Sequence, residues 1–148
     1  MSLWFLEVTP ENLNTISRNS MVEHVGIEFL EIGEDYIKAR MPVDHRTIQP
    51  VGPLHGGASV TLAETLGSVG ASLCVDLSKK VCVGLEVNAN HVRSVSSGVV
   101  FGTARPVHIG SSTQVWEIRI TDEQDRLVCI SRITMAVLDR EGQVASGK

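Results

Sequence analysis

Residues 54–75, LHGGASVTLAETLGSVGASLCV, decide the fold of this chain. A stripe of bulky apolar residues at spacings of three and four predicts a helix over residues 58–75. The stripe consists of Leu62, Leu66, Val69 and Leu73. Most other positions hold Gly, Ala or Ser, although each glycine inside a helix costs about 1 kcal/mol relative to alanine. We therefore expect a slim helix that is buried on all sides, with backbone or another subunit pressed against it.

A short helix and two strands are expected before this segment. Thr9 followed by Pro10 is typical of a helix N-cap and first turn, and predicts a helix that ends near Asn19. Residues 27–32 and 36–41 are predicted strands, the second with polar and apolar side chains in alternation. Because a Gly-Glu-Asp turn separates them, we expect a hairpin.

Four longer strands are predicted after the helix. They cover residues 81–89, 99–107, 114–121 and 126–138. Short turns that contain Gly or Asp separate successive runs and indicate an antiparallel meander. The expected architecture is α+β, with one curved antiparallel sheet wrapped around the long helix, and we assign residues 1–148 to this single domain.

The composition excludes several classes of protein. The chain has 148 residues, of which 43% are hydrophobic and 20% charged, so general disorder is not expected. Thirteen Lys and Arg against 17 Asp and Glu give a net charge of −4, which argues against a nucleic-acid partner. A local basic pocket for a small anion is compatible with this charge.

Cysteines, histidines and the start of the chain give three further expectations. Cys74, Cys82 and Cys129 form no C-x-x-C pair, and we expect buried thiols in a reducing cytosol. The five histidines match no metal-binding spacing, and neither a nucleophile elbow nor a P-loop occurs, so no metal site is expected. The first residues lack the pattern of a secretory signal, and a cytoplasmic location is expected.

Glu64 is the outlier of the sequence, because it is the only Asp, Glu, Lys or Arg between positions 47 and 75. A charge at a bilayer centre costs about 2.5–3.5 kcal/mol on insertion scales, so a buried helix is favoured over a membrane span. Desolvation there favours the protonated carboxyl, and a nearby donor restores the charge. We interpret Glu64 as a candidate catalytic residue; a structural carboxylate bonded to a buried group is the alternative.

The sequence His55-Gly56-Gly57 places backbone N–H groups at the positive end of the predicted helix, where an anion or a carbonyl oxygen is stabilised. Gly56 lets a ligand approach its N–H closely, and a loop or capping role is the alternative. Glu64 lies roughly 12 Å further along the helix axis. Either the ligand spans that gap, or a second chain brings its own Glu64 to the site.

Two polar segments end predicted strands, NHVRS at residues 90–94 and HIGSS at residues 108–112. As a pair they could hold phosphates, whereas each alone is also compatible with an ordinary turn.

These motifs, in this order, resemble the hotdog-fold acyl-CoA thioesterases, and above all the branch that acts on aryl-CoA thioesters such as 4-hydroxybenzoyl-CoA and 1,4-dihydroxy-2-naphthoyl-CoA. The proofreading thioesterase of enterobactin biosynthesis is similar too. The resemblance covers about residues 10–138. Its motifs are MPVD at 41–44, RTIQP at 46–50, LHGGA at 54–58, AE at 63–64, GS at 67–68, VGLE at 83–86, NANHVRS at 88–94, HIGS at 108–111 and QVW at 114–116.

The resemblance implies a role for each matching residue. Glu64 corresponds to the catalytic carboxylate, as nucleophile or as base for water, and the Gly56 N–H to the donor that polarises the thioester carbonyl. Gln49 and His55 correspond to residues beside that carbonyl and carboxylate, and Ser68 to a hydroxyl one helical turn past Glu64. The implied substrate and coenzyme A contacts are Gly84, His91, Arg93, Ser94, His108, Ser111 and Ser112; at position 112 relatives often carry a basic residue.

The implied function is hydrolysis of an acyl-CoA, with an aromatic or otherwise bulky acyl group, or of the corresponding acyl carrier protein thioester. Coenzyme A is then part of the substrate and no cofactor is needed. The family places its active sites between subunits, so a homodimer is the minimum and a homotetramer is expected. This agrees with the gap between Gly56 and Glu64 within one chain.

Two other functions stay open at this stage. A hotdog hydratase or dehydratase would use a histidine and a carboxylate, such as His55 and Glu64, as acid and base, and would form an enoyl-CoA without free thiol. A non-catalytic acyl-CoA binder has no need of a carboxylate beside a carbonyl donor. Measuring thiol release from a panel of acyl-CoAs separates the three, because a fold alone does not define the chemistry.

Overall fold

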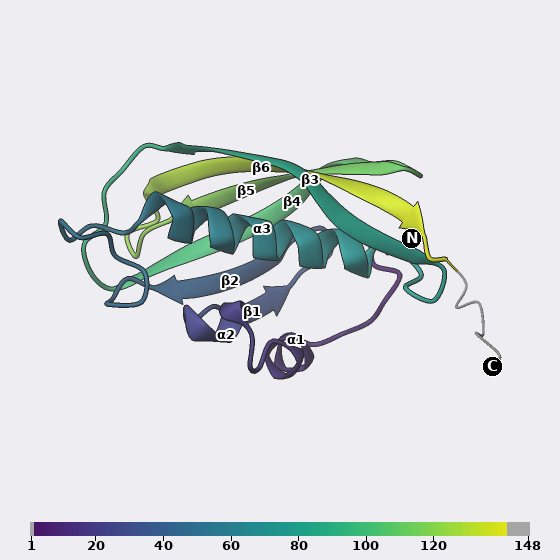
Figure 1. Ribbon diagram of the computed structural model, residues 1–148, viewed down its shortest axis with the longest axis horizontal. Helices are drawn as coiled ribbons and strands as arrows, with labels where there is room; N and C mark the ends of the chain where they lie inside the picture. The colour runs from purple at the N-terminus through teal and green to yellow at the C-terminus, as the bar shows by residue number, and fades with distance from the viewer. Residues whose placement is uncertain (1, 142–148) are drawn as a thin grey trace, which may run out of the picture.

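Six antiparallel strands form one sheet that curves around a long helix, as expected from the sequence (Figure 1). The structure is a computed structural model, and it describes residues 2–141. The elements, in chain order, are α1 (Pro10–Ile16), α2 (Met21–His24), β1 (Glu28–Ile32), β2 (Ile37–Pro42), α3 (Gly56–Leu73), β3 (Lys80–His91), β4 (Val99–Ile109), β5 (Thr113–Thr121) and β6 (Leu127–Asp139).

The order of the strands differs from the expected meander. The sheet runs β1-β2-β4-β5-β6-β3, so of the four strands after α3 only β4, β5 and β6 are neighbours in chain order. Strand β2 pairs along β4, from Ile37 opposite Ala104 to Pro42 opposite Val99. Because β2 occupies that side of β4, β3 pairs with β6 instead and becomes an edge strand. The first hairpin, β1 with β2, is confirmed.

One face of α3 packs against the inside of the sheet. Its leucines Leu62 and Leu66 are fully buried. Glycine is required at Gly67, because a Cβ there would lie 2.3 Å from Ile133 Cγ2. Because Gly67 has no side chain, the helix backbone lies directly on side chains of β5 and β6.

The opposite face of α3 is open in the single chain, so of the two expected covers of the helix, the backbone of the same chain does not cover this face. Glu64 is exposed, and Thr61, Thr65 and Ser68 are partly exposed. The hydrophobic pattern predicted the packed face correctly. The small residues elsewhere on the helix do not imply that a layer of the same chain covers them.

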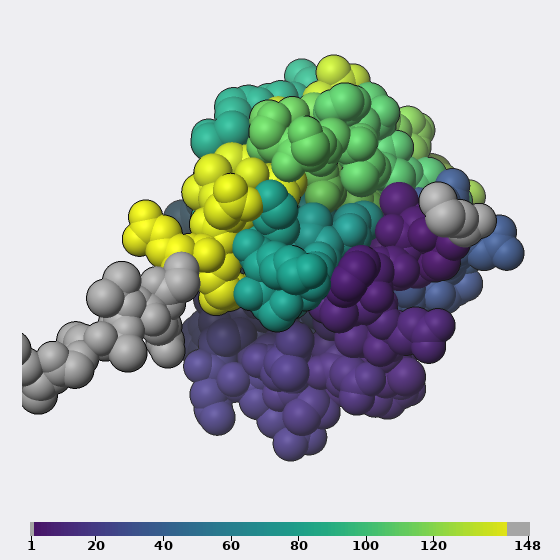
Figure 2. Space-filling view, turned by 90° about the vertical axis from the view of Figure 1, so that its right-hand side faces the viewer, coloured from purple at the N-terminus to yellow at the C-terminus, as the bar shows by residue number. Residues whose placement is uncertain are grey.

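The N-terminal segment holds the C-terminal end of α3. The indole of Trp4 stacks on that of Trp116, with 6.1 Å between the ring centroids. The backbone N–H groups of Phe5 and Leu6 both donate to the Leu73 carbonyl, at 2.8 and 3.1 Å. Figure 2 shows this end of the helix (teal) between the N-terminal segment (purple) and β6 (yellow). The segment satisfies a carbonyl that the helix itself leaves without a partner.

The predicted N-terminal helix is present but shorter. Thr9 caps α1, accepting a hydrogen bond from the Asn12 N–H at 3.1 Å, and Pro10 is the first helical residue, as expected. Helix α2 was not expected from the sequence. Its signal was Ser20 three residues before Glu23, a spacing typical of a helix start, and Ser20 does accept from the Val22 N–H.

The three cysteines are free thiols, as expected, but only Cys129 is buried. Cys74 and Cys82 are half-buried. Desolvation by burial raises the pKa of the Cys74 thiol to about 12, with a smaller contribution from nearby Cys82. None of them is therefore suited to act as a thiolate nucleophile at neutral pH.

Candidate active site

Helix α3 begins at Gly56, two residues earlier than predicted, because His55 caps it. The backbone of His55 is extended, and its Nδ1 accepts a hydrogen bond from the Gly57 N–H at 2.8 Å. Its carbonyl oxygen accepts from the N–H groups of Ala58 and Ser59. An imidazole thus takes the role that a Ser or Asp side chain usually fills at a helix start.

The cap leaves one amide of the helix start without a partner. The N–H groups of Gly57, Ala58 and Ser59 are all used by His55. Among residues 2–141 the Gly56 N–H donates to no protein acceptor. The sequence predicted several available N–H groups; the structure provides one, at the positive end of an 18-residue helix.

Gly56 lines a cleft of about 380 Å³ with a polar lining. The cleft brings together Gln49, the helix start and the end of β3, as the predicted roles require. It is lined by Gln49, Pro53, Leu54, Gly56, Ser59, His91, Val92, Arg93, Ser94 and Val128.

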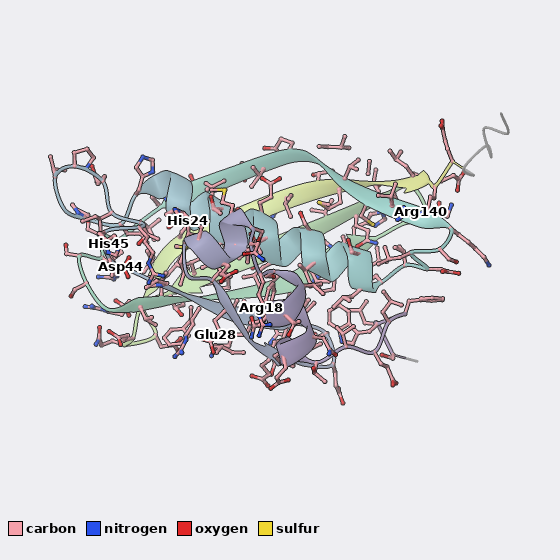
Figure 3. The ribbon with its side chains drawn as sticks, turned by 60° about the horizontal axis from the view of Figure 1, so that its bottom comes forward. Arg18, His24, Glu28, Asp44, His45 and Arg140 are labelled. Carbon is pink, nitrogen blue, oxygen red and sulfur yellow. The ribbon has the colours of Figure 1, made fainter. Side chains whose placement is uncertain are left out.

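The loop between β2 and α3 holds Gln49 in this cleft through its own hydrogen bonds. Buried Thr47 donates from its hydroxyl to the Pro42 carbonyl at 2.6 Å and accepts at its carbonyl from the His55 N–H at 2.8 Å. The Gln49 N–H donates to the Pro53 carbonyl at 2.8 Å. Asp44 begins this loop, at the end of the molecule opposite Arg140 (Figure 3). The backbone is thus fixed while the Gln49 amide is left for a ligand.

Glu64 lies on the open face of α3, in a different environment. It lines an apolar cavity of about 400 Å³, formed by α2 and α3, with Met21, Val22, Thr61, Thr65, Ser68 and Val69. On its other side it reaches β3, where a Cβ at Gly84 would lie 3.3 Å from Glu64 Oε1. The expected burial of Glu64 is therefore wrong for the single chain, whereas its position beside a cavity agrees with a site role.

Ser68 lies one helical turn past Glu64, as predicted, and lines the same cavity. Its hydroxyl donates to the Met135 sulfur at 3.9 Å, a weak contact that leaves the oxygen available. Gly84 belongs to the same region, since its missing side chain leaves room for the Glu64 carboxylate.

Within one chain the predicted residues form two separate groups. Gly56 and Gln49 line the polar cleft, and Glu64 and Ser68 line the apolar cavity. Gly56 and Glu64 are roughly 12 Å apart along the helix. A single copy therefore does not bring these four residues into one cavity.

The two predicted phosphate segments also lie apart. His91 pairs with Cys129 at one end of β6, whereas the Ser112 carbonyl accepts from the Val137 N–H at the other end. Eight residues of a strand span about 26 Å. Only His91, Arg93 and Ser94 share the cleft of Gly56, so the idea that both segments hold phosphates together does not apply to one chain. The second segment, His108, Ser111 and Ser112, is exposed on the hairpin between β4 and β5.

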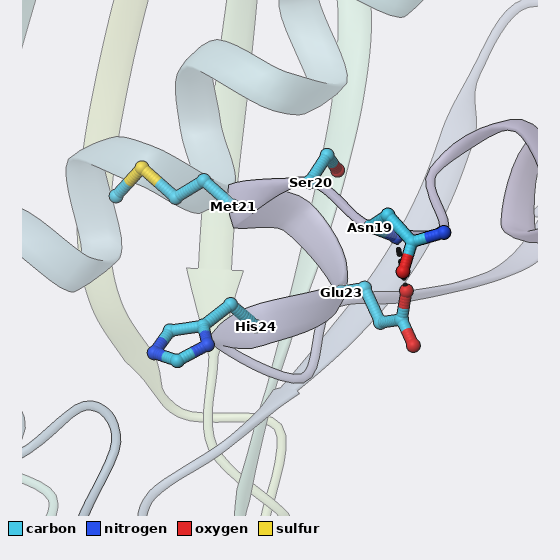
Figure 4. Close-up of a pocket in the computed structure, with 5 residues that line it drawn as sticks. All are labelled: Asn19, Ser20, Met21, Glu23 and His24. Carbon is cyan, nitrogen blue, oxygen red and sulfur yellow. Dashed lines mark hydrogen bonds between the residues drawn. The ribbon is translucent and has the colours of Figure 1, made fainter.

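A larger hollow, of about 650 Å³, holds none of the predicted site residues. It is a shallow surface lined by Asn19, Ser20, Met21, Glu23 and His24 (Figure 4). The Glu23 carboxylate there accepts a hydrogen bond from the Asn19 N–H. Helix α2 was not predicted from the sequence, although its Met21 and Val22 line the cavity beside Glu64.

No group of three or more His, Cys, Asp or Glu side chains in residues 2–141 could hold a metal ion. In the same part of the chain, no helix has the length and apolar character needed to cross a membrane.

A six-stranded antiparallel sheet curved around one long helix is the hotdog fold. The model of the Thioesterase superfamily matches residues 52–129, and the chain belongs to this family of thioester hydrolases.

Named relatives and solved structures agree over almost the whole chain. The 1,4-dihydroxy-2-naphthoyl-CoA hydrolase of Escherichia coli is 53% identical over 92% of this chain and 99% of its own length. The proofreading thioesterase EntH of Cronobacter turicensis is 49% identical over 92% of this chain and 98% of its own. The crystal structure of a thioesterase from Haemophilus influenzae superposes with a TM-score of 0.92 at 51% identity, covering 96% of this chain and 99% of that one.

Proposed function

We propose that this chain hydrolyses an acyl-CoA with an aromatic or otherwise bulky acyl group, releasing the free acid and coenzyme A. One observation carries the proposal. The residue with the only free amide at the start of α3 lines a polar cleft, and the only carboxylate of the same helix lines an apolar cavity. The relative that hydrolyses 1,4-dihydroxy-2-naphthoyl-CoA supports an aromatic acyl group.

Each group has a defined part in the reaction. The Gly56 N–H donates to the thioester carbonyl and stabilises the negative charge that grows on its oxygen. A Glu64 oxygen attacks the carbonyl carbon, or it accepts a proton from a water that attacks. The carbon–sulfur bond then breaks, and coenzyme A leaves as a thiolate that takes up a proton. In the first route water hydrolyses the resulting anhydride, so both routes consume one water.

The acyl group fits the apolar cavity beside Glu64. The cavity of about 400 Å³ lies within the range of small-molecule sites, and Met21, Val22 and Val69 give it apolar walls. At the polar end, Arg93 supplies a positive charge for the phosphates of coenzyme A, together with Ser94. Exposed His108, Ser111 and Ser112 are the second set of coenzyme A contacts in this proposal.

The active enzyme in this proposal is a homodimer in which Glu64 of the partner subunit completes the site at Gly56. Strand β3 supports it, because it is a 12-residue edge strand with Val83 39% and Leu85 61% exposed. Such an edge readily pairs with another copy of itself. Glu64 lies against Gly84 in the middle of this edge. A homotetramer follows if the exposed apolar side chains Val107 and Leu138 are covered by a second dimer.

The first test measures thiol release with a dye on a panel of aromatic and aliphatic acyl-CoAs. We expect the fastest turnover with an aromatic substrate. Glu64→Ala is expected to lower turnover by about 10²–10⁴-fold with an unchanged melting temperature, because an exposed side chain is removed. An enoyl-CoA product without free thiol would indicate a hydratase, and binding without turnover would indicate a binding protein; either result overturns the proposal.

The second test asks whether the site is shared. Glu64→Ala and Gly56→Leu homodimers are both expected to be inactive, because one lacks the carboxylate and the other blocks the amide. Mixed dimers of the two variants contain one site with an intact Gly56 and an intact Glu64 of the partner subunit. We expect such mixtures, after refolding together, to regain activity. A mixture as inactive as its parents would place both groups in one chain.

A further inference from the structure

The space beside Gly56 is occupied by the imidazole of His91. A Cβ at position 56 would lie 3.0 Å from His91 Nε2, 3.3 Å from Cε1 and 3.4 Å from Cδ2. Glycine at this position therefore accommodates the His91 ring as well as an approaching ligand. This contact was not expected from the sequence, which placed His91 only among the coenzyme A contacts.

His91 is held by its backbone, whereas its ring is free. It is the last residue of β3 and pairs with Cys129 of β6, and the following Val92 N–H donates to the Val128 carbonyl at 2.8 Å. Neither of its ring nitrogens has a hydrogen-bond partner among residues 2–141. The strand end thus presents an unpaired imidazole to the cleft that Gly56 lines.

The other histidine of the helix start, His55, does not line this cleft. His55 Nδ1 already accepts from the Gly57 N–H, so that nitrogen is committed to capping α3. The imidazole with both nitrogens available beside the free amide is that of His91.

The distances allow one oxygen to bond to both groups. Since His91 Nε2 is 3.0 Å from the Cβ position of Gly56, it lies at most about 5.5 Å from the Gly56 nitrogen by standard bond geometry. An oxygen about 2.9 Å from each nitrogen satisfies both hydrogen bonds. No other backbone amide of the helix start is available to supply a second donor.

We infer that His91 Nε2–H is the second donor to the thioester carbonyl oxygen, beside the Gly56 N–H. This rests on the proposed function. A neutral imidazole with its proton on Nε2 suffices, and no proton is transferred. Because negative charge accumulates on that oxygen in the tetrahedral intermediate, both hydrogen bonds strengthen as the reaction proceeds. His91 is then a catalytic residue and not a coenzyme A contact.

Two non-hydrolysable analogues of an aromatic acyl-CoA test this assignment. In the ketone analogue a methylene replaces the sulfur and the carbonyl is kept, whereas the thioether analogue has the sulfur and lacks the carbonyl. His91→Ala is expected to weaken binding of the ketone by up to about tenfold, the effect of one hydrogen bond, and to leave the thioether affinity unchanged. Its kcat should fall about 10²-fold, and its KM should rise by no more than the loss of affinity for the ketone.

Three matched variants complete the experiment, each checked for folding by its melting temperature. His91→Gln keeps a donor and should recover part of the lost kcat. Arg93 lines the same cleft, and Arg93→Ala should weaken the binding of both analogues equally. His45→Ala changes a histidine whose side chain is 88% exposed and should change neither affinity.

Two results would overturn the inference. If His91→Ala loses affinity for both analogues equally, His91 is a coenzyme A contact. If the variant keeps the kcat of wild type, His91 has no role at the carbonyl. The proposed function is judged separately: if wild type hydrolyses acyl-CoA and Glu64→Ala does not, the hydrolase assignment stands whatever His91→Ala does.

Discussion

The two faces of helix α3 have opposite properties although they alternate along the same 18 residues. Towards the sheet, Leu62 and Leu66 are fully buried, and Gly67 contacts β6 through its backbone. On the other face, Glu64 is exposed beside a cavity and a sheet edge. One side of the helix therefore stabilises the fold, whereas the other side carries residues of the candidate site. Substitutions on the two faces should separate stability from activity.

The largest effect on stability is expected at the packed face. Leu66→Ala should lower the free energy of unfolding by about 2–5 kcal/mol, because it leaves a cavity under the helix. Chemical denaturation at one fixed protein concentration measures this change, since dimerisation would make stability depend on concentration. Thr65→Ala, the neighbouring position on the open face, is the control. Equal losses in the two variants would contradict the difference between the faces.

A smaller loss is expected when a methyl group is added at the packed face. Gly67→Ala should cost about 1–3 kcal/mol, because its Cβ would lie 2.3 Å from Ile133 Cγ2. Thermal and chemical unfolding measure it, with Ser68→Ala as the open-face control, expected within about 0.5 kcal/mol of wild type. If the clash is the cause, combining Gly67→Ala with Ile133→Ala should cost less than the two single losses together. Simple additivity would point to a different cause.

The smallest effect concerns the loop that carries Gln49, and it depends on pH. Hydrogen bonds from the Arg46 guanidinium and N–H hold the pKa of Asp44 at about 2, below its usual 3.8. The folded state therefore favours the ionised carboxylate, which stabilises the protein above the unfolded pKa and loses this contribution as the pH falls through about 2. Asp44→Asn should be slightly less stable than wild type at neutral pH, because a side chain 34% exposed is screened by solvent.

Melting temperatures of both proteins between neutral pH and pH 2 test this prediction. The difference between wild type and Asp44→Asn should be constant near neutrality and should shrink as the pH falls from about 4 towards 2. A difference that grows on acidification would show that the carboxylate is not the stabilising form.

Much of the fold could be predicted because local patterns carry it. The leucine stripe predicted α3, and apolar runs, several of them alternating with polar residues, predicted all six strands within a few residues. Thr9 and Pro10 predicted the start of α1, which the capping hydrogen bonds confirm. The order of the strands could not be predicted in this way, because alternation defines which face of a strand is buried and does not identify its neighbour.

The site was predictable by residue type and less so by environment. Glu64 stood out as an isolated charge, and Gly56 as a glycine at a helix start. The exposure of Glu64 was missed, because small residues around a helix are equally consistent with burial and with an open face. His91 and Gly56 are 35 positions apart in sequence, and only the pairing of β3 with β6 brings the imidazole beside the amide.

The sequence by itself determined the helix, the strands and the chemistry available, because the period of a hydrophobic pattern and the pKa class of a side chain are local properties. Only the tertiary structure decided that β3 becomes the open edge, that His55 caps α3 and leaves one amide free, and that Glu64 and Gly56 face different cavities. These three features depend on which elements pack against one another, and this packing involves residues from the whole chain.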